Sequence, residues 1–429
     1  MTTPAFRAVS FTPARTSGAS RANHSLTPLR STSRTFACAL VFFCAAVSVT
    51  SSAQTFTSLF GFNGTNGANP YAVLVSDPTG NLYGTTQFGG AYGQGEVYKI
   101  APDGTETVLH SFCSDFPTCS DGSQPFGGLV LATNGIFYGT TLHTVFRITP
   151  AGDLTTLYTF CSLSGCADGE FPYDSLVQGS DGNFYGTTAL GGTDTQTCGG
   201  SCGTVFKITP EGALTTLHTF HGLDGWGPLA GLILGGDGNF YGTAPGGGAH
   251  KLGVAFQVTS SGTYTLLHSF NGADGEEPSS SLLLASDGNF YGSTANGGSA
   301  GYGVVFKMSS AGKLAVLRSF DNTDGSAPGN LVQVPNGNFY GVTGSGGNPD
   351  QGIDLCSFNG CGTIFELTRA GSLTTLYKFC SQTDCADGSG PSGLTLAADG
   401  KLYGATVLGG STACGADGSC GTVFRFTAK

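Results

Sequence analysis

Cysteine is the residue type whose spacing in this chain most clearly points to chemistry. Of 14 cysteines, Cys38 and Cys44 lie in an apolar N-terminal stretch, and the other twelve form six closely spaced pairs. An even set of paired cysteines in an exported chain is typical of disulfides. We therefore predict six local disulfides: Cys113/Cys119, Cys161/Cys166, Cys198/Cys202, Cys356/Cys361, Cys380/Cys385 and Cys414/Cys420.

The six local disulfides have two alternatives. The last three pairs lie in neighbouring loops and could exchange partners, because spacing does not fix connectivity. Zinc is a second alternative, since two such pairs can converge on one ion. No histidine accompanies the pairs, so we predict disulfides, with no metal and no cofactor.

A second recurring polar group is the aspartate of an Asp-Gly-x-x-Pro element. The element occurs six times, with an asparagine in a seventh copy: Asp121, Asp168, Asp224, Asp274, Asp324, Asp387 and Asn66. We interpret these residues as Asx turns that cap backbone amides. A calcium-binding ring is the alternative, but the element lacks the dense oxygen ligands of calcium loops.

Histidine offers no catalytic pattern. His110, His218 and His268 share one repeated strand position with Tyr158, Arg318 and Tyr377, which indicates a structural role. No HExxH pattern occurs, so no catalytic residue is predicted.

Aromatic and acidic residues that vary between loops are the candidates for ligand binding. We select Trp226, Tyr173, Phe171, Glu170, Tyr92 and Tyr302. The same loops also hold Phe116, Phe358, Asp174, Asp194, Glu276, Glu277, Asp350 and Asp354. Aromatic rings beside carboxylates suit a carbohydrate or a peptide, and ordinary loop decoration is the alternative.

A repeated unit must position all of these residues. A Tyr-Gly dipeptide that follows a turn recurs seven times, at intervals of 47 to 63 residues, with tyrosines at Tyr83, Tyr138, Tyr185, Tyr241, Tyr291, Tyr340 and Tyr403. A period near 50 is typical of propeller blades. Each unit holds four runs with the composition of strands, joined by turns such as Asp181-Gly182, which suit tight hairpins.

These units predict an all-β fold, a seven-bladed β-propeller with four antiparallel strands per blade. The stretch 55–62 matches a fourth strand, and the last unit lacks its own, so we expect the N-terminal strand to join the last blade. Closure of this kind removes exposed sheet edges. A β-solenoid is the alternative. It would not explain why the fourth strand of the last unit is found at the N-terminus of the chain.

Composition agrees with such a ring. Only 10% of the residues are charged, and the chain has 71 Gly, 31 Phe and 15 Tyr. We expect the repeated Tyr and two repeated Phe sets to pack between blades. The Phe sets are Phe112, Phe160, Phe220, Phe270, Phe320 and Phe379, and Phe146, Phe206, Phe256, Phe306, Phe365 and Phe424. In a four-stranded blade the second–third and fourth–first strand loops leave on the same side, so the cysteine pairs should share one face.

The N-terminus predicts export. Residues 1–35 are basic, 36–49 are apolar, and small residues precede Gln54. This pattern is typical of a signal peptide cleaved near Ala53, because the apolar run is short for a membrane span. We expect residues 54–429 to form one monomeric domain, secreted or held in the periplasm or cell envelope, with no membrane span after cleavage. The net charge of −11 disfavours nucleic acid as a partner.

The unit also resembles a known family. The pattern DGNFYGTT…GG…GTVFKITPEGALTTLHTF…DG…P is similar to the GloVer tandem repeat of bacterial exported proteins and, more distantly, to propeller repeats such as kelch. The resemblance covers 55–429 and implies export and a propeller fold. Some members carry a C-terminal sorting anchor, which this chain lacks, so the resemblance implies secretion.

The functional prediction is a binding or interaction module, with a carbohydrate or protein ligand at the disulfide-rich loop face. Two alternatives differ in class. One is an extracellular glycan-cleaving hydrolase or lyase, which requires convergent titratable residues. The other is a purely structural envelope protein, which requires no pocket.

Overall fold

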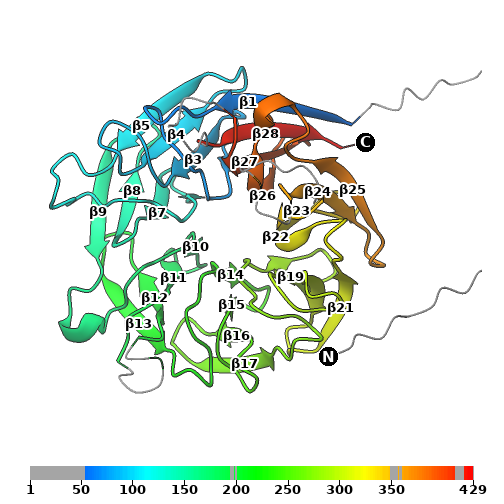
Figure 1. Ribbon diagram of the computed structural model, residues 1–429. Helices are drawn as coiled ribbons and strands as arrows, with labels where there is room; N and C mark the ends of the chain where they lie inside the picture. Colours follow the sequence, from blue (N-terminus) through cyan, green and yellow to red (C-terminus); the bar gives the residue numbers. More distant parts are fainter. Residues whose placement is uncertain are drawn as a thin grey trace, which may run out of the picture. The chain divides into compact units, whose positions relative to one another are not determined.

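The computed structural model describes residues 54–193, 198, 201–347, 356, 360–410 and 420–428. The predicted signal peptide lies outside these residues. Residues 51–429 group into one compact unit. Within the described ranges the strands form seven four-stranded antiparallel sheets, arranged around a centre as the blades of a propeller (Figure 1). The predicted fold class is confirmed.

The first four blades have the strand order a, b, c, d from the centre outward. Blade 1 is β2 (Val75–Ser76), β3 (Leu82–Thr86), β4 (Glu96–Ile100) and β5 (Glu106–Ser111). Blade 2 is β6 (Val130–Leu131), β7 (Phe137–Thr140), β8 (Thr144–Ile148) and β9 (Leu154–Thr159). Blade 3 is β10 (Val177–Gln178), β11 (Phe184–Thr188), β12 (Thr204–Ile208) and β13 (Leu214–Thr219). Blade 4 is β14 (Ile233–Leu234), β15 (Phe240–Ala244), β16 (Val254–Val258) and β17 (Tyr264–Ser269).

The remaining three blades complete the ring. Blade 5 is β18 (Leu283–Leu284), β19 (Phe290–Thr294), β20 (Val304–Met308) and β21 (Leu314–Ser319). Blade 6 is β22 (Ser326–Gln333), β23 (Phe339–Ser345), β24 (Thr363–Leu367) and β25 (Leu373–Lys378). Blade 7 is β26 (Ser389–Leu396), β27 (Leu402–Leu408), β28 (Thr422–Thr427) and, from the other end of the chain, β1 (Thr55–Gly61).

Strand β1 is the outer strand of blade 7. It pairs antiparallel with β28, from Thr55 opposite Thr427 to Gly61 opposite Thr422. Phe56 stacks on Tyr377 of the neighbouring blade, with ring centroids 4.2 Å apart. Phe62, just after the strand, is fully buried.

The Tyr-Gly dipeptide has a separate role on each face of a blade. On one face the tyrosine ring of each of blades 1 to 5 contacts a phenylalanine of the next blade, as Tyr185 does with Phe240 at 3.8 Å between centroids. On the other face the glycine makes room for a ring of its own blade. A Cβ on Gly186 would lie 2.7 Å from Phe206 Cζ, and Gly186 and Phe206 are cross-strand partners.

The two repeated Phe sets also meet between blades. Each d-strand Phe contacts the c-strand Phe of the following blade edge to face, as Phe160 does with Phe206 at 5.1 Å. At the junction of blades 7 and 1, Phe62 contacts Tyr98 in the same way. The prediction that these aromatic residues pack between blades is therefore confirmed.

The a–b turn explains why the tyrosine carries a hydroxyl. In blade 3, Asp181 Oδ1 accepts the backbone N–H of Asn183, and Oδ2 accepts the Tyr185 hydroxyl at 2.8 Å. The same Tyr-to-Asp bond occurs at Tyr83, Tyr241, Tyr291 and Tyr403. Because the bond ties a turn to an inter-blade ring, it fixes the angle at which the strands leave the hairpin.

Short helical turns are the other elements of the described residues. The 3-10 turns η1 (Ser164–Cys166) and η2 (Thr383–Cys385) lie in the loops before blades 3 and 7. No helix among the described residues is long and apolar enough to span a membrane.

Candidate functional site

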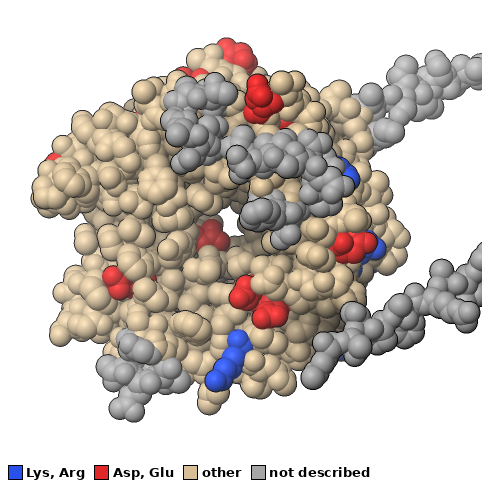
Figure 2. Space-filling model, viewed as in Figure 1, with Lys and Arg blue, Asp and Glu red and all other residues tan. Residues whose placement is uncertain are grey.

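The d–a and b–c loops meet on one face of the ring. Single β-bridges join the two kinds of loop within a blade: Glu170 to Leu190, Trp226 to Gly246, and Glu276 to Asn296. The space-filling view shows an opening at the centre of the ring with acidic side chains beside it (Figure 2). The variable loops therefore surround the central opening, as the strand order predicts.

The repeated aspartate organises each d–a loop. In blade 4, Asp224 Oδ1 accepts the backbone N–H of His221, and Oδ2 lies 3.0 Å from His218 Nε2. The same pattern recurs at Asp121 with His110 and at Asp274 with His268. The Asx interpretation is confirmed, and the d-strand histidines are partners of the capping aspartates.

The strand-d residue that contacts the capping aspartate differs between blades, whereas the aspartate itself is kept. Tyr158 donates to Asp168, Tyr377 donates to Asp387, and Arg318 pairs with Asp324. In the loop that follows β1 the aspartate is replaced by Asn66, and strand β1 has Phe60 at the matching position. Burial raises the pKa of Asp168, but hydrogen bonds from Tyr158 and Ser162 outweigh it and leave the pKa below its usual value.

Disulfides close the longer loops of this face. Five of the six predicted pairs are disulfides: Cys113–Cys119, Cys161–Cys166, Cys198–Cys202, Cys356–Cys361 and Cys380–Cys385. Cys420 is also disulfide-bonded, and its predicted partner Cys414 lies outside the described residues. The sulfurs of the two disulfides in blade 6 and the following loop lie within 4.8 Å of one another, and the pairing is local.

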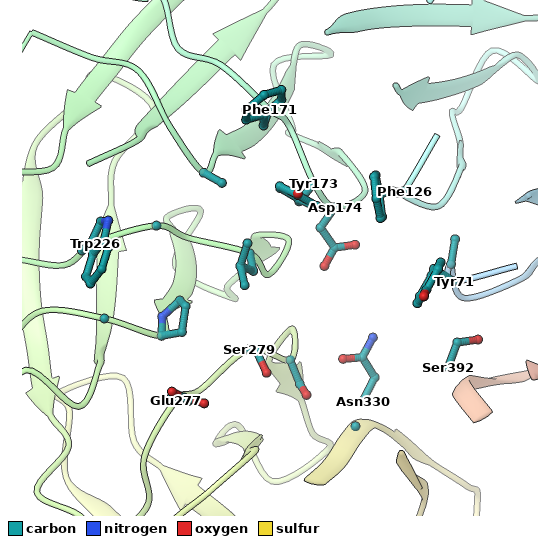
Figure 3. A pocket seen from close by; sticks show the side chains of 18 of the residues that line it. Tyr71, Phe126, Phe171, Tyr173, Asp174, Trp226, Glu277, Ser279, Asn330 and Ser392 are labelled. Atoms are coloured by element: carbon teal, nitrogen blue, oxygen red, sulfur yellow. The ribbon is translucent and has the colours of Figure 1, made fainter. Parts of the chain in front are cut away.

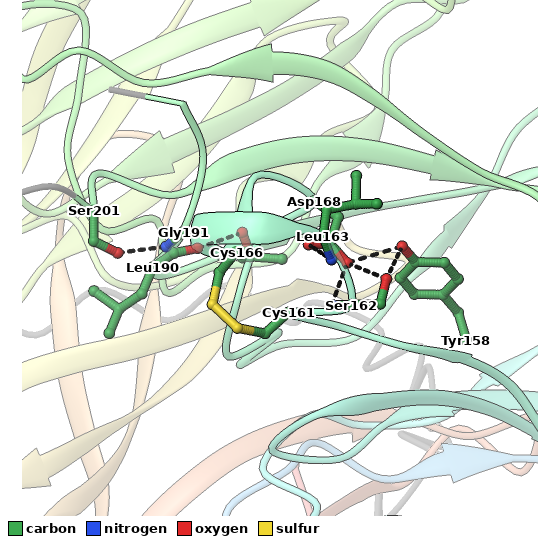
Figure 4. Close-up of a disulfide and its surroundings, with 10 residues drawn as sticks. Tyr158, Cys161, Ser162, Leu163, Cys166, Asp168, Leu190, Gly191 and Ser201 are labelled. Carbon is green, nitrogen blue, oxygen red and sulfur yellow. Dashed lines mark hydrogen bonds between the residues drawn. A yellow bond between two sulfur atoms is a disulfide. The ribbon is translucent and has the colours of Figure 1, made fainter. Parts of the chain in front are cut away.

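Loop length explains which d–a loops have a disulfide. The strand-d phenylalanine and the capping aspartate are eight residues apart from Phe160 to Asp168, but four apart from Phe220 to Asp224. Figure 4 shows the longer loop, where Cys161–Cys166 closes the added residues and Asp168 accepts from Ser162 and Leu163. The b–c loop joins the same network through the Gly192 N–H, which donates to the Cys166 carbonyl at 2.9 Å.

A cavity of about 940 Å³ lies at the centre of this face. All seven blades contribute to it through residues that follow the repeated proline (Figure 3). The residue directly after each proline lines the cavity, in the order Tyr71, Phe126, Tyr173, Leu229, Ser279, Gly329 and Ser392. One half of the wall is therefore large and apolar, and the other half is small or polar.

Aromatic rings form a continuous arc along the apolar half. The Tyr71 and Phe126 ring centroids are 5.8 Å apart, and those of Phe126 and Tyr173 are 4.8 Å apart. Tyr173 then contacts Phe171, with 6.4 Å between centroids. The side chain of Tyr71 is 45% exposed, so the arc presents ring surface to a ligand.

Asp174 lies beside this arc and forms hydrogen bonds with residues of blades 3, 4 and 5. Its Oδ1 accepts the backbone N–H and the hydroxyl of Ser175. Its Oδ2 accepts the Gly231 N–H at 2.6 Å and the Ser281 hydroxyl at 2.9 Å. These four bonds fill the acceptor positions of a carboxylate, so Asp174 is a positioning residue of the cavity wall.

Polar side chains form the opposite half of the cavity. Glu277 and Ser279 are exposed there, from the loop before blade 5. Asn330 Oδ1 accepts the Ser281 N–H at 3.0 Å, which directs the amide of Asn330 toward the centre (Figure 3). Lys251 also lines the cavity. The site thus combines ring faces with a carboxylate, an amide, a hydroxyl and an ammonium group.

The six residues selected from the sequence separate into two groups. Trp226, Tyr173 and Phe171 line the cavity. The other three lie elsewhere on the same face: Glu170 pairs with Leu190, Tyr92 is half-exposed in a b–c loop, and the Tyr302 carbonyl accepts the Ala327 N–H. Asp194, Asp350, Asp354 and Phe358 lie outside the described residues.

Sequence reasoning missed Tyr71, Phe126 and Asn330. A signal for the first two was available, because both directly follow the repeated proline of the Asp-Gly-x-x-Pro element. Comparison of that single position across the seven units predicts which units place a large apolar side chain in the cavity wall and which place a small or polar one.

Comparison with solved structures shows the same fold in distant sequences. The structure of streptogramin B lyase aligns with a TM-score of 0.57 at 14% identity, over 88% of this chain and 98% of that chain. The extracellular domain of BT4673 from B. thetaiotaomicron aligns with a TM-score of 0.58 at 11% identity, over 88% of this chain and 40% of the other. The extracellular domain of BT3049 from the same organism gives 0.54 at 12%, with 88% and 42% covered.

Sequence comparison identifies the repeat itself. No curated protein sequence matches the chain. The Gloeobacter/Verrucomicrobia repeat matches twice, over residues 45–199 and 195–357. These matches cover more than half of the chain, and they span six of the seven Tyr-Gly units that form the blades. The chain therefore belongs to the Gloeobacter/Verrucomicrobia repeat family.

Proposed function

We propose that this protein is an exported binding module that holds a carbohydrate in the central cavity. The observation that carries the proposal is the arc of Tyr71, Phe126 and Tyr173, which faces the polar residues of blades 5 and 6. Sugar rings present apolar C–H faces and a rim of hydroxyls. Aromatic side chains with a few fixed polar groups are suited to both.

The rigidity of the loops supports binding. Each d–a loop of blades 2 to 7 is capped by its own aspartate, and the longer loops are closed by disulfides. A preformed site loses less conformational entropy when it binds. The disulfides also agree with an oxidising compartment outside the cytoplasm, which is where we place the protein.

The glycan-cleaving alternative has weaker support. A general acid or base needs a carboxylate that can exchange a proton with the substrate. Asp174, the carboxylate beside the aromatic arc, is committed to four hydrogen bonds from its neighbours. That leaves Glu276 and Glu277 as the other carboxylates that line the cavity, and Glu277 Oε2 accepts a hydrogen bond from the Asn296 amide at 2.7 Å. The purely structural alternative gives no reason for an asymmetric cavity.

A glycan array probed with the purified protein tests the proposal. We expect binding without cleavage, and we expect Tyr173→Ser to weaken it by about three- to tenfold, since aromatic contacts contribute ~0.5–1.5 kcal/mol. Serine stands at the same position in blades 5 and 7, so the variant should fold. Tyr92→Ser is the matched control, because Tyr92 is exposed on the same face outside the cavity.

Each other outcome selects a different function. Cleavage products in mass spectrometry would replace the proposal with a hydrolase or lyase. Binding on a peptide or protein array, without glycan binding, would identify a protein ligand. Equal loss in Tyr92→Ser and Tyr173→Ser would move the site away from the cavity, and no ligand on either array would favour a structural envelope protein.

A further inference from the structure

The d–a loop after blade 3 brings three metal-ligating side chains together at the edge of the ring. His218 Nε2 lies 3.0 Å from Asp224 Oδ2, and His221 Nδ1 lies 3.6 Å from the same oxygen. All three ligand atoms lie within 4.8 Å of one another. This cluster is separate from the lining of the central cavity.

The second imidazole distinguishes this loop from its repeats. His110–Asp121 and His268–Asp274 form the same strand-to-loop pair, so the pair alone has a structural role. The position of His221 is occupied elsewhere by Asn63, Cys113, Cys161, Asn271, Asp321 and Cys380. Only the loop containing Asp224 combines two histidines with the carboxylate.

Neighbouring groups hold the cluster in place. The Tyr264 ring stacks on His218, with centroids 4.0 Å apart and planes 12° apart, and its hydroxyl donates to the Asp224 carbonyl. Asp224 Oδ1 accepts the His221 N–H at 2.7 Å, so Oδ2 is the oxygen that faces both imidazoles.

We propose that His218, His221 and Asp224 bind one divalent transition-metal ion of the kind that prefers imidazole ligands, such as Zn²⁺. Two ligands about 2.1 Å from one ion lie roughly 3.0 to 3.6 Å apart when the angle between them is about 90° to 120°. The observed separations fall in this range. His221 is 57% exposed in its side chain, so the remaining coordination positions face solvent.

Zinc titration of the purified full chain tests the proposal, with a histidine-free tag and no reductant so that the cysteines stay oxidised. We expect about one equivalent of Zn²⁺ to bind in calorimetry, and Co²⁺ to give a visible absorption band at the same stoichiometry. His221→Asn should weaken Zn²⁺ binding by at least about tenfold. Asn271 stands at this position beside the His268–Asp274 pair, so the variant should fold.

Controls separate this cluster from other histidines. His250→Asn removes an exposed histidine of a b–c loop and should leave Zn²⁺ binding unchanged. Thermal unfolding without metal should be the same for the parent and His221→Asn. Absence of stoichiometric Zn²⁺ binding, or equal affinity in the parent and His221→Asn, would overturn the proposal. Carbohydrate binding is measured separately on the glycan array, so the zinc proposal and the carbohydrate proposal can be rejected independently of each other.

Discussion

At the residue scale, the glycine of the Tyr-Gly dipeptide is a packing requirement. Gly186 faces Phe206 and Leu176, and an added Cβ would lie 2.7 Å and 2.8 Å from their side-chain carbons. The same contact occurs at Gly139 with Phe146 and at Gly242 with Phe256. The repeat therefore keeps glycine there because the interior ring of each blade occupies the space.

Gly186→Ala tests this packing. We expect the free energy of unfolding to fall by about 1–3 kcal/mol, because extra atoms in a packed core force neighbours out of their rotamers. Gly236→Ala is the matched control, since a Cβ there meets nothing within 4 Å. Chemical denaturation of both variants measures the difference, and equal stability would contradict the packing argument.

Blade 1 departs from the repeat at a half-buried position. Glu106 stands where blades 2 and 3 have Leu154 and Leu214. Its Oε1 is buried without a hydrogen-bond partner among the described residues. Burial, together with the charge of Glu96, raises the pKa of Glu106 to about 7. The folded state therefore favours the protonated carboxyl.

This pKa predicts a pH dependence of stability. An unfolded Glu ionises near pH 4.3, so between there and about pH 7 the unfolded state loses its proton first and the fold loses stability as pH rises. Glu106→Leu should remove this loss and stabilise the protein at pH 8 by the order of 1 kcal/mol, allowing for partial solvation. Thermal unfolding from pH 4 to 8 measures it. Glu211→Gln, at an exposed turn, should follow the parent profile, and a parallel profile for Glu106→Leu would contradict the assignment.

At the element scale, one residue decides the form of strand a. The repeated proline precedes the strand-a leucine by four positions in blades 1 to 5, as from Pro172 to Leu176, but by three in blades 6 and 7, as from Pro328 to Leu331. In the shorter version the strand runs unbroken from the loop, as in β22 and β26. In the longer version the extra residue interrupts the strand, and all five of these segments line the cavity.

Strand β1 is the element whose removal has the clearest consequence. Deletion of 54–62 removes the partner of β28 and the buried Phe62. We expect a loss of at least about 4 kcal/mol in the free energy of unfolding, since truncation of a buried Phe alone costs about 3–5 kcal/mol. Equilibrium unfolding measures this loss.

Relocation of the strand is the control for that deletion. Residues 54–62, placed after Ala428 through a turn such as Pro210–Gly212, should restore stability, because the strand order of blade 7 is kept. A deletion variant as stable as the parent would show that β1 contributes little to the ring.

At the scale of the whole molecule, the charge and the disulfides point to the same compartment. The chain is acidic, with a net charge of −11, and its five Arg before residue 35 lie in the predicted signal peptide. Five disulfides each close a loop of one face. We therefore expect the exported form to lack 1–53 and to be more acidic than the full chain.

N-terminal sequencing of the exported protein tests this expectation. Signal peptidase cleaves after small residues, so the mature chain should begin at or next to Gln54. Ala53→Asp should slow processing, whereas Ala46→Leu, within the apolar stretch, should not. An exported protein that retains residue 1 would contradict the prediction.

The sequence alone determined the number of blades, the strands of each blade and the five disulfides within the described residues. It did so because these features are local and repeated. The structure of a hairpin turn, of a Tyr-Gly pair or of two nearby cysteines can be predicted from a few adjacent residues. Seven copies of one pattern make each local signal unmistakable.

The tertiary structure decided which side chains share the cavity. Tyr71 and Asn330 are 259 positions apart in the sequence, and both line the cavity because ring closure brings the first segment of every blade to one centre. Asp174 likewise meets Ser281 across 107 residues. Such contacts have no local signal, since they depend on the angle between blades, which the packing of buried rings sets.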